Sequence, residues 1–125
     1  MRTRGPELRE SEWLEILALV EEMNQLNKSV LVEGKDDVGA LRSAGVVCTV
    51  LTLPDFEDLV EKGEIREVVV LTDLDRAGDE HLKRLLRKHG SSVVFLTGVR
   101  QRLRRTRRCR RGMRRVSEIF RAPES

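Results

Sequence analysis

Short apolar runs alternate with amphipathic stretches along most of the chain. Four runs rich in β-branched residues are bounded by turn-forming residues, a pattern typical of buried parallel strands; they lie at 29–32, 46–51, 67–71 and 92–96. Stretches with apolar residues at helical spacing separate and precede these runs; they lie at 13–26, 36–44, 55–61 and 78–88. The alternation predicts a three-layer α/β/α domain with a central, mostly parallel sheet of about four strands.

Residues at the ends of the amphipathic stretches predict where the helices begin and end. Ser11 is suited to be the N-cap of the first helix, which leaves residues 1–10 as a loose start. Asn27 ends that helix. Gly45 and Gly90 are placed to cap the C-termini of the second and fourth helices. We therefore expect four helices with short connections to the strands.

Acidic residues follow two of the predicted strands directly. Asp73 and Asp75 come after the third run, and Glu33 comes after the first. Residues i and i+2 of an extended chain point the same way, so Asp73 and Asp75 can converge. Ligands of open parallel sheets bind beyond the carboxyl ends of the strands. If the two strands are neighbours, the three carboxylates meet there, and an oxygen-preferring cation such as Mg²⁺ would relieve their repulsion.

Two segments carry a resemblance to a known family. The segments Glu33-Gly34-Lys35-Asp36-Asp37 and Asp73-Leu74-Asp75-Arg76-Ala77-Gly78 resemble the motifs of the Toprim (topoisomerase–primase) domain. The resemblance extends over residues 29–97 and is strongest to the small stand-alone Toprim proteins of prokaryotes. It implies a Toprim-like, Rossmann-like fold. It also implies Glu33 as general acid or base, and a Mg²⁺ or Mn²⁺ ion bound by Asp73, Asp75 and Glu33.

Two classes of function are compatible with these motifs. A bound metal would polarise a phosphoryl oxygen, so the first hypothesis is a Mg²⁺-dependent nuclease or phosphotransferase that processes RNA or DNA. The second is a noncatalytic Toprim module that binds nucleic acid or recruits a partner. The chain contains no tyrosine, the residue with which topoisomerases of this family form their covalent DNA intermediate. Asp37 and Asp79 are further acids near the motifs, for which helix capping is the preferred interpretation.

The end of the chain differs sharply in charge from the rest. Residues 99–125 contain eleven arginines and two glutamates, whereas the residues before them are acidic overall. Such asymmetry indicates a polyanionic partner, or a tail that folds back on an acidic body. Nucleic acid is the favoured partner, with phosphate contacts expected from Lys35, Arg76, Arg100, Arg104 and Arg105.

Apolar residues in this basic tail are few, so no core-facing helix is expected there. Val116, Ile119 and Phe120 are the exception, a small apolar set suited to dock on the body. The chain accordingly divides into an N-terminal segment and helix at 1–27, a Toprim-like domain at 28–98 and an arginine-rich extension at 99–125.

No signal peptide and no apolar run near eighteen residues is present, so we expect a cytoplasmic protein without membrane contact. The two cysteines, Cys48 and Cys109, show no zinc-binding spacing. The choice between RNA and DNA, and between a monomer, a homodimer and an assembly with protein partners, stays open.

Overall fold

Four parallel strands form one sheet in the computed structural model, which describes residues 5–124. In spatial order the strands are β2 (Val50–Leu51), β1 (Val30–Leu31), β3 (Glu67–Val70) and β4 (Val94–Leu96). The chain runs from β1 to β2 at one edge, then returns past β1 to β3 and β4. The strand order therefore reverses between β1 and β3, which is where doubly wound folds bind ligands.

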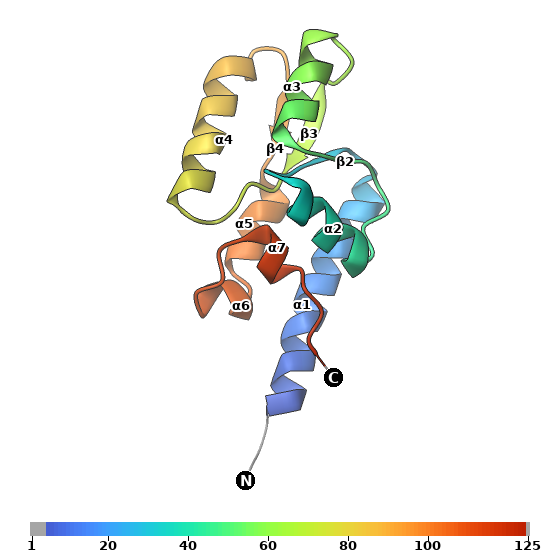
Figure 1. Cartoon of the computed structure of the whole chain (residues 1–125), viewed down its shortest axis with the longest axis vertical. Coiled ribbons are helices and arrows are strands. Elements are labelled where there is room, and N and C mark those ends of the chain that lie inside the picture. The colour runs from blue at the N-terminus through green and yellow to red at the C-terminus, as the bar shows by residue number, and fades with distance from the viewer. Residues whose placement is uncertain (1–4, 125) are drawn as a thin grey trace.

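Helices cover both faces of this sheet, as the alternating pattern predicts (Figure 1). The helices are α1 (Gly5–Leu26), α2 (Lys35–Ala44), α3 (Leu53–Glu61), α4 (Arg76–His89), α5 (Gly98–Arg104), α6 (Arg107–Arg110) and α7 (Val116–Ile119). One face packs against α3 and α4, and the other packs against α1, α2, α5 and the C-terminal segment. The predicted three-layer α/β/α architecture is confirmed. None of the helices in the described range is long and apolar enough to cross a membrane.

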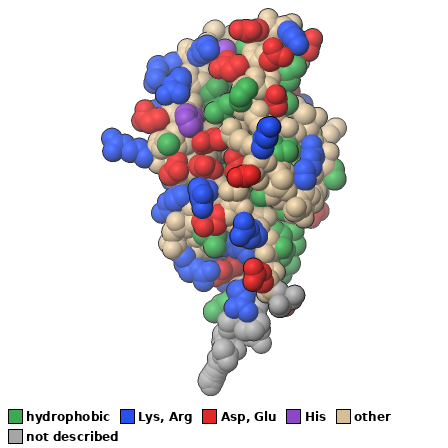
Figure 2. Space-filling view, viewed as in Figure 1, with side chains coloured by type: hydrophobic (Ala, Val, Ile, Leu, Met, Phe, Trp, Pro, Cys, Tyr) green, Lys and Arg blue, Asp and Glu red, His purple; other side chains and the backbone are tan. Residues whose placement is uncertain are grey.

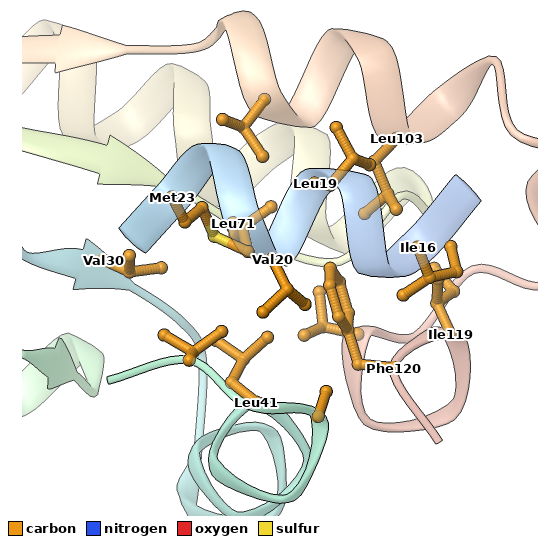
Figure 3. Packing of buried hydrophobic residues seen from close by; sticks show 14 of the residues in the cluster. Ile16, Leu19, Val20, Met23, Val30, Leu41, Leu71, Leu103, Ile119 and Phe120 are labelled. Carbon is orange, nitrogen blue, oxygen red and sulfur yellow. The ribbon is translucent and has the colours of Figure 1, made fainter. Parts of the chain in front are cut away.

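Alternate residues of the central strands face opposite layers, because side chains in a strand point alternately to the two faces. Val30 and Val69 belong to the larger core, with α1, α2 and the C-terminal segment (Figure 3). Leu31 and Val70 belong to the smaller core, which Phe56 of α3 completes together with Leu85 of α4. Both faces of β1 and β3 are thus buried, which explains their continuous apolar sequence.

The first helix begins earlier than predicted. It starts at Gly5, whereas Ser11 lies inside it and its hydroxyl accepts a hydrogen bond from Arg107 (2.6 Å). The predicted loose start is therefore wrong for residues 5–10, and residues 1–4 lie outside the described residues. The predicted end is confirmed, since Asn27 adopts a positive φ of 51° directly after α1.

The second strand is much shorter than the apolar run 46–51 that predicts it. Side chains from neighbouring helices form hydrogen bonds with the backbone of residues 46–48, before the strand. Arg42 donates to the carbonyls of Val46 (2.9 Å) and Cys48 (2.6 Å), and Asn24 accepts from the N–H of Val47 (2.8 Å). Only Val50 and Leu51 remain to pair with β1.

The basic tail is an integral part of the larger core, which corrects the expectation that it lacks core-facing helices. Six of its apolar side chains are at most 2% exposed; they are Val99, Leu103, Cys109, Val116, Ile119 and Phe120. Three short helices, α5, α6 and α7, each bury only one or two apolar side chains, so no single stretch shows the pattern of a long amphipathic helix. The predicted boundary between residues 98 and 99 therefore does not separate two cores.

Arginines of the tail pair with glutamates along α1. Arg107 contacts Glu15 (2.8 Å) and Arg111 contacts Glu12 (2.5 Å), while Arg102 pairs with Glu22. Arg108 lies over the ring of Trp13, 5.1 Å from its centroid. Of the two interpretations of the charge asymmetry, a tail folded back on an acidic body thus describes much of this segment.

Candidate functional site

Glu33 and Asp73 meet at the carboxyl ends of β1 and β3. The two strands are neighbours, with Leu31 opposite Val70, so the residues that follow them emerge side by side. The backbone N–H of Asp73 donates to Glu33 Oε2 at 2.9 Å. The predicted convergence of the two motif segments at one sheet edge is confirmed, and this edge is the switch point of the strand order.

Asp75 lies at the start of α4 and caps it. Its Oδ1 accepts from the N–H of Gly78 at 2.7 Å. Gly78 packs so closely on the preceding loop that a Cβ there would lie 1.8 Å from the carbonyl oxygen of Asp73. Glycine is therefore required at this position, and the close packing fixes Asp73 and Asp75 relative to α4.

The C-terminal segment reaches the same edge through its backbone. The N–H of Val116 donates to Asp73 Oδ1 (2.8 Å), and the N–H of Ser117 donates to Asp37 Oδ1 (3.1 Å). Asp37 Oδ2 also accepts from the N–H of Gly34 (3.1 Å), the N-cap residue of α2, so Asp37 takes part in capping this helix as predicted. Two carboxylates of the edge are thus tied to the first residues of α7.

The protonation of Asp73 and Asp37 reflects this crowded, half-buried setting. Burial raises the pKa of Asp73 to about 6; the hydrogen bond from Val116 opposes the rise, and the charges of Glu33, Asp37 and Asp75 add to it. Burial also raises the pKa of Asp37, against the hydrogen bonds from Gly34 and Ser117. On the face of the molecule drawn in Figure 2, acidic side chains gather near the middle, between α4 and the helices α2 and α7.

His81 is a member of the site that sequence reasoning missed. Its Nδ1 lies 3.1 Å from Glu33 Oε1, although the angles are not those of a hydrogen bond. A signal was available: Gly78, His81 and Leu85 recur at helical spacing and share the inward face of α4. The predicted inward face of this helix contained only its leucines.

Two arginines predicted as phosphate contacts are engaged in contacts within the protein. Arg100 is 6% exposed and donates to the carbonyls of Thr72 (3.0 Å) and Asp73 (2.5 Å). Arg100 and Arg104 both bind Asp79 Oδ1, at 2.8 and 3.1 Å. The hydrogen bond from Arg100 is the main reason why the pKa of Asp79 is lowered, so Asp79 is an ion-pair partner and not a helix cap.

The remaining predicted phosphate contacts are on the surface. Lys35 and Arg76 are exposed at the first positions of α2 and α4, next to the acidic edge. Arg105 is exposed at the end of α5. The structure thus places Lys35 and Arg76 beside the carboxylates, and Arg100 beneath them.

The donor set at this edge suits a hard cation in chemistry, but it is not assembled as a finished metal site. Among residues 5–124, no three His, Cys, Asp or Glu side chains are grouped as metal ligands. Asp73 and Asp75 each have Oδ1 engaged by a backbone N–H, and Oδ2 has no hydrogen-bond partner within the described part of the chain. Carboxylate oxygens are the ligands that Mg²⁺ and Mn²⁺ prefer.

The fold and this edge define a doubly wound α/β protein with a carboxylate-lined switch point. No protein-family model matches the chain. Similar sequences include the UPF0292 protein of Thermococcus gammatolerans, 37% identical over 73 residues, which are 56% of this chain and 55% of that protein. The UPF0292 protein PH1700 of Pyrococcus horikoshii is 34% identical over 71 residues, 54% of each chain. This chain thus spans about half the length of these relatives.

Two further comparisons extend over more of the chain. The UPF0292 protein PF1724 of Pyrococcus furiosus is 34% identical over 92 residues, 70% of this chain and 66% of that protein. A solved structure of a protein from Aquifex aeolicus superposes with a TM-score of 0.66 at 22% identity, covering 81% of this chain and 94% of that one. The structural likeness shows a shared fold.

Proposed function

We propose that this chain is a Toprim-type protein that binds Mg²⁺ or Mn²⁺ at the carboxyl edge of its sheet and performs phosphodiester chemistry on nucleic acid. The convergence of Glu33, Asp37, Asp73 and Asp75 at the switch point carries this proposal. Gathering like charges in a half-buried place is costly, and a cation between them removes the cost. The reaction class is that of a nuclease or phosphotransferase.

Each residue has a role in this proposal. Asp73 and Asp75 hold the cation through the oxygens that Val116 and Gly78 leave free. The cation, when bound, polarises a phosphoryl oxygen and stabilises the charge that develops on it. Glu33 is held by the N–H of Asp73 through Oε2, so its Oε1 is the atom that takes a proton from the attacking oxygen or returns one to the leaving oxygen.

His81 is placed to serve Glu33 in this scheme. Its Nδ1 is 3.1 Å from Glu33 Oε1, the oxygen that handles the proton. A small rotation of either side chain would bring the imidazole into a hydrogen bond that orients the carboxylate. His81 is therefore a positioning residue in the proposal, while Glu33 is the group that touches the reacting atoms.

A noncatalytic module that binds nucleic acid or recruits a protein partner is the second candidate. Asp73 Oδ1 is already bonded to Val116, and the residues from 5 to 124 contain no complete metal-ligand group. Both observations favour an edge at which Mg²⁺ would only bridge the carboxylates to a phosphate, without turnover. The two candidates differ in whether product forms when Mg²⁺ is present.

Replacing the carboxylates one at a time tests the proposal. Wild-type protein is incubated with a labelled structured RNA and a labelled DNA duplex, in Mg²⁺ and in EDTA, and compared with Asp73→Asn and Asp75→Asn. We expect the wild type to cleave in Mg²⁺ and each variant to lower the cleavage rate by about 100-fold or more. The reason is that loss of a residue that only hydrogen-bonds to a metal ligand already lowers metal affinity or activity by about 10–100-fold.

Glu64→Gln is the matched control, because Glu64 is an exposed carboxylate away from the edge. It should cleave like wild type. Cleavage that survives in both aspartate variants would place the chemistry elsewhere. Binding of either nucleic acid by the wild type with no product in Mg²⁺ or Mn²⁺ would favour the second candidate.

A further inference from the structure

We infer that a groove beside the acidic edge is the path of a nucleic-acid strand, with Lys35, Arg115 and Arg121 as its phosphate contacts. This inference rests on the proposed function and names the surface that holds its substrate. Two adjoining hollows share Lys35, Asp36, Arg115 and Ser117, so they form one continuous groove between α2 and the C-terminal segment. One end reaches Glu33 of the acidic edge, and the other reaches Arg121.

These cations differ from most other basic residues of the tail. Lys35, Arg115 and Arg121 are exposed, and none forms an ion pair within residues 5–124. Five tail arginines are instead paired with carboxylates: Arg100, Arg102, Arg104, Arg107 and Arg111. Of the cations near the site that internal pairing leaves free, Lys35, Arg115 and Arg121 therefore lie along this groove, and Arg76 lies outside it.

The groove floor favours contact with a backbone rather than with bases. It includes Gly39, Ala40 and Ser43 of α2, whose small side chains allow close approach. Phe120 also borders it but is 1% exposed, so no aromatic ring is presented for base stacking. Phosphate contacts by exposed cations are sequence-independent and salt-dependent.

The start of α2 adds a second attraction for phosphate. Lys35 is the first residue of this ten-residue helix, and the N-cap Gly34 offers no side-chain acceptor to the free N–H groups of the first turn. Such a helix start favours an anion. Three acids line the groove as well: Asp36 is exposed beside Lys35, whereas Glu33 and Asp37 lie at the acidic end, where the proposed cation would offset their charge. A strand lying in the groove would present a phosphodiester to Glu33 at the acidic end.

Salt-dependent binding of single-stranded probes tests this path. Fluorescein-labelled 20-nucleotide DNA and RNA of one sequence are titrated by fluorescence anisotropy in EDTA over a range of salt. We expect Lys35→Ala, Arg115→Ala and Arg121→Ala each to weaken binding several-fold. Each should also reduce the slope of log K against log salt by about 0.7, the value for one lost phosphate contact to a single strand.

Arg87→Ala and Arg110→Ala are matched controls, because both are exposed arginines outside the groove. They should bind like wild type, with thermal midpoints of all variants unchanged. Equal losses in the controls, or no binding by the wild type at low salt, would overturn the inference. Poly-L-glutamate provides a further test. If it competes as well as unlabelled nucleic acid per unit of negative charge, and does so through the same three residues, the inference is overturned in favour of an acidic protein as the partner.

Asp73→Asn separates this inference from the proposed function. In EDTA it should bind the probes as wild type does, since the groove cations are intact. Binding that follows Lys35, Arg115 and Arg121 while no nucleic acid is ever cleaved would uphold the groove and reject the chemistry. Cleavage that is lost in Asp73→Asn while binding ignores the three cations would do the opposite.

Discussion

Two charged regions of this protein place carboxylates in opposite surroundings. Along α1, glutamates face arginines of the tail. Burial there tends to raise the pKa of Glu15, but hydrogen bonds and charge from Arg107, with Arg110, lower it overall. At the sheet edge carboxylates gather without such partners, and burial, with smaller additions from the charges of the neighbouring carboxylates, raises the pKa of Asp73 to about 6. Opposite charges brought together stabilise a fold, whereas like charges gathered in a half-buried place lower its stability.

Removal of the tail should have the largest effect on this comparison. A chain ending at Gly98 loses the six buried apolar side chains of the tail. Each is worth about 1.5–3 kcal/mol, and a whole domain is stable by about 5–15 kcal/mol. We expect no cooperative thermal unfolding by circular dichroism. A chain ending at Ala122, which keeps these side chains and the bond from Arg108 to the carbonyl of Arg121, should melt like wild type. A cooperative transition in the shorter chain would show that the arginine-rich segment is dispensable for folding.

Neutralising the edge should stabilise the protein at the expense of its proposed function. The pKa of Asp73 is raised from 3.8 to about 6 by folding, so stability falls as pH rises between these values and stays lower above about pH 6. Asp73→Asn keeps an acceptor for Val116 without the charge. We expect it to raise the free energy of unfolding by on the order of 1 kcal/mol at about pH 8, after allowance for solvent screening, and by little at about pH 4.

Urea denaturation in EDTA at both pH values measures this effect, with Glu64→Gln as a control that should change neither. Adding Mg²⁺ at about pH 8 should stabilise wild type more than Asp73→Asn, because the cation takes over the compensation of charge. Equal destabilisation by Asp73→Asn at both pH values would mean that the carboxylate is not under electrostatic strain.

A single α1–tail ion pair should have the smallest effect. Glu15 and Arg107 are 2.8 Å apart with side chains 33% and 34% exposed. A double-mutant cycle with Glu15→Ala and Arg107→Ala should give a coupling of about 0.2–1 kcal/mol that shrinks in high salt. Coupling of several kcal/mol, or coupling that ignores salt, would mean that this interface resembles a buried network rather than a row of surface pairs.

The sequence predicted the sheet and the convergence of Glu33 and Asp73 for a physical reason. β-branched runs buried on both faces have a distinct pattern, and residues after neighbouring parallel strands must emerge at one edge. The role of the tail was not predictable in the same way. Its buried apolar residues, such as Leu103 and Phe120, are separated in the sequence by arginines, most of which are exposed or paired with carboxylates. Short helical turns leave too few apolar residues in any window to reveal a core face.

The links from Val116 and Ser117 to the acidic edge have a consequence for how this protein changes over time. Both donors are main-chain N–H groups, which every residue except proline possesses. Selection can therefore preserve the links while the side chain at 117 drifts freely, provided that the segment keeps its length and its path. An alignment of side-chain identities would give no sign that this end of the chain touches the carboxylates.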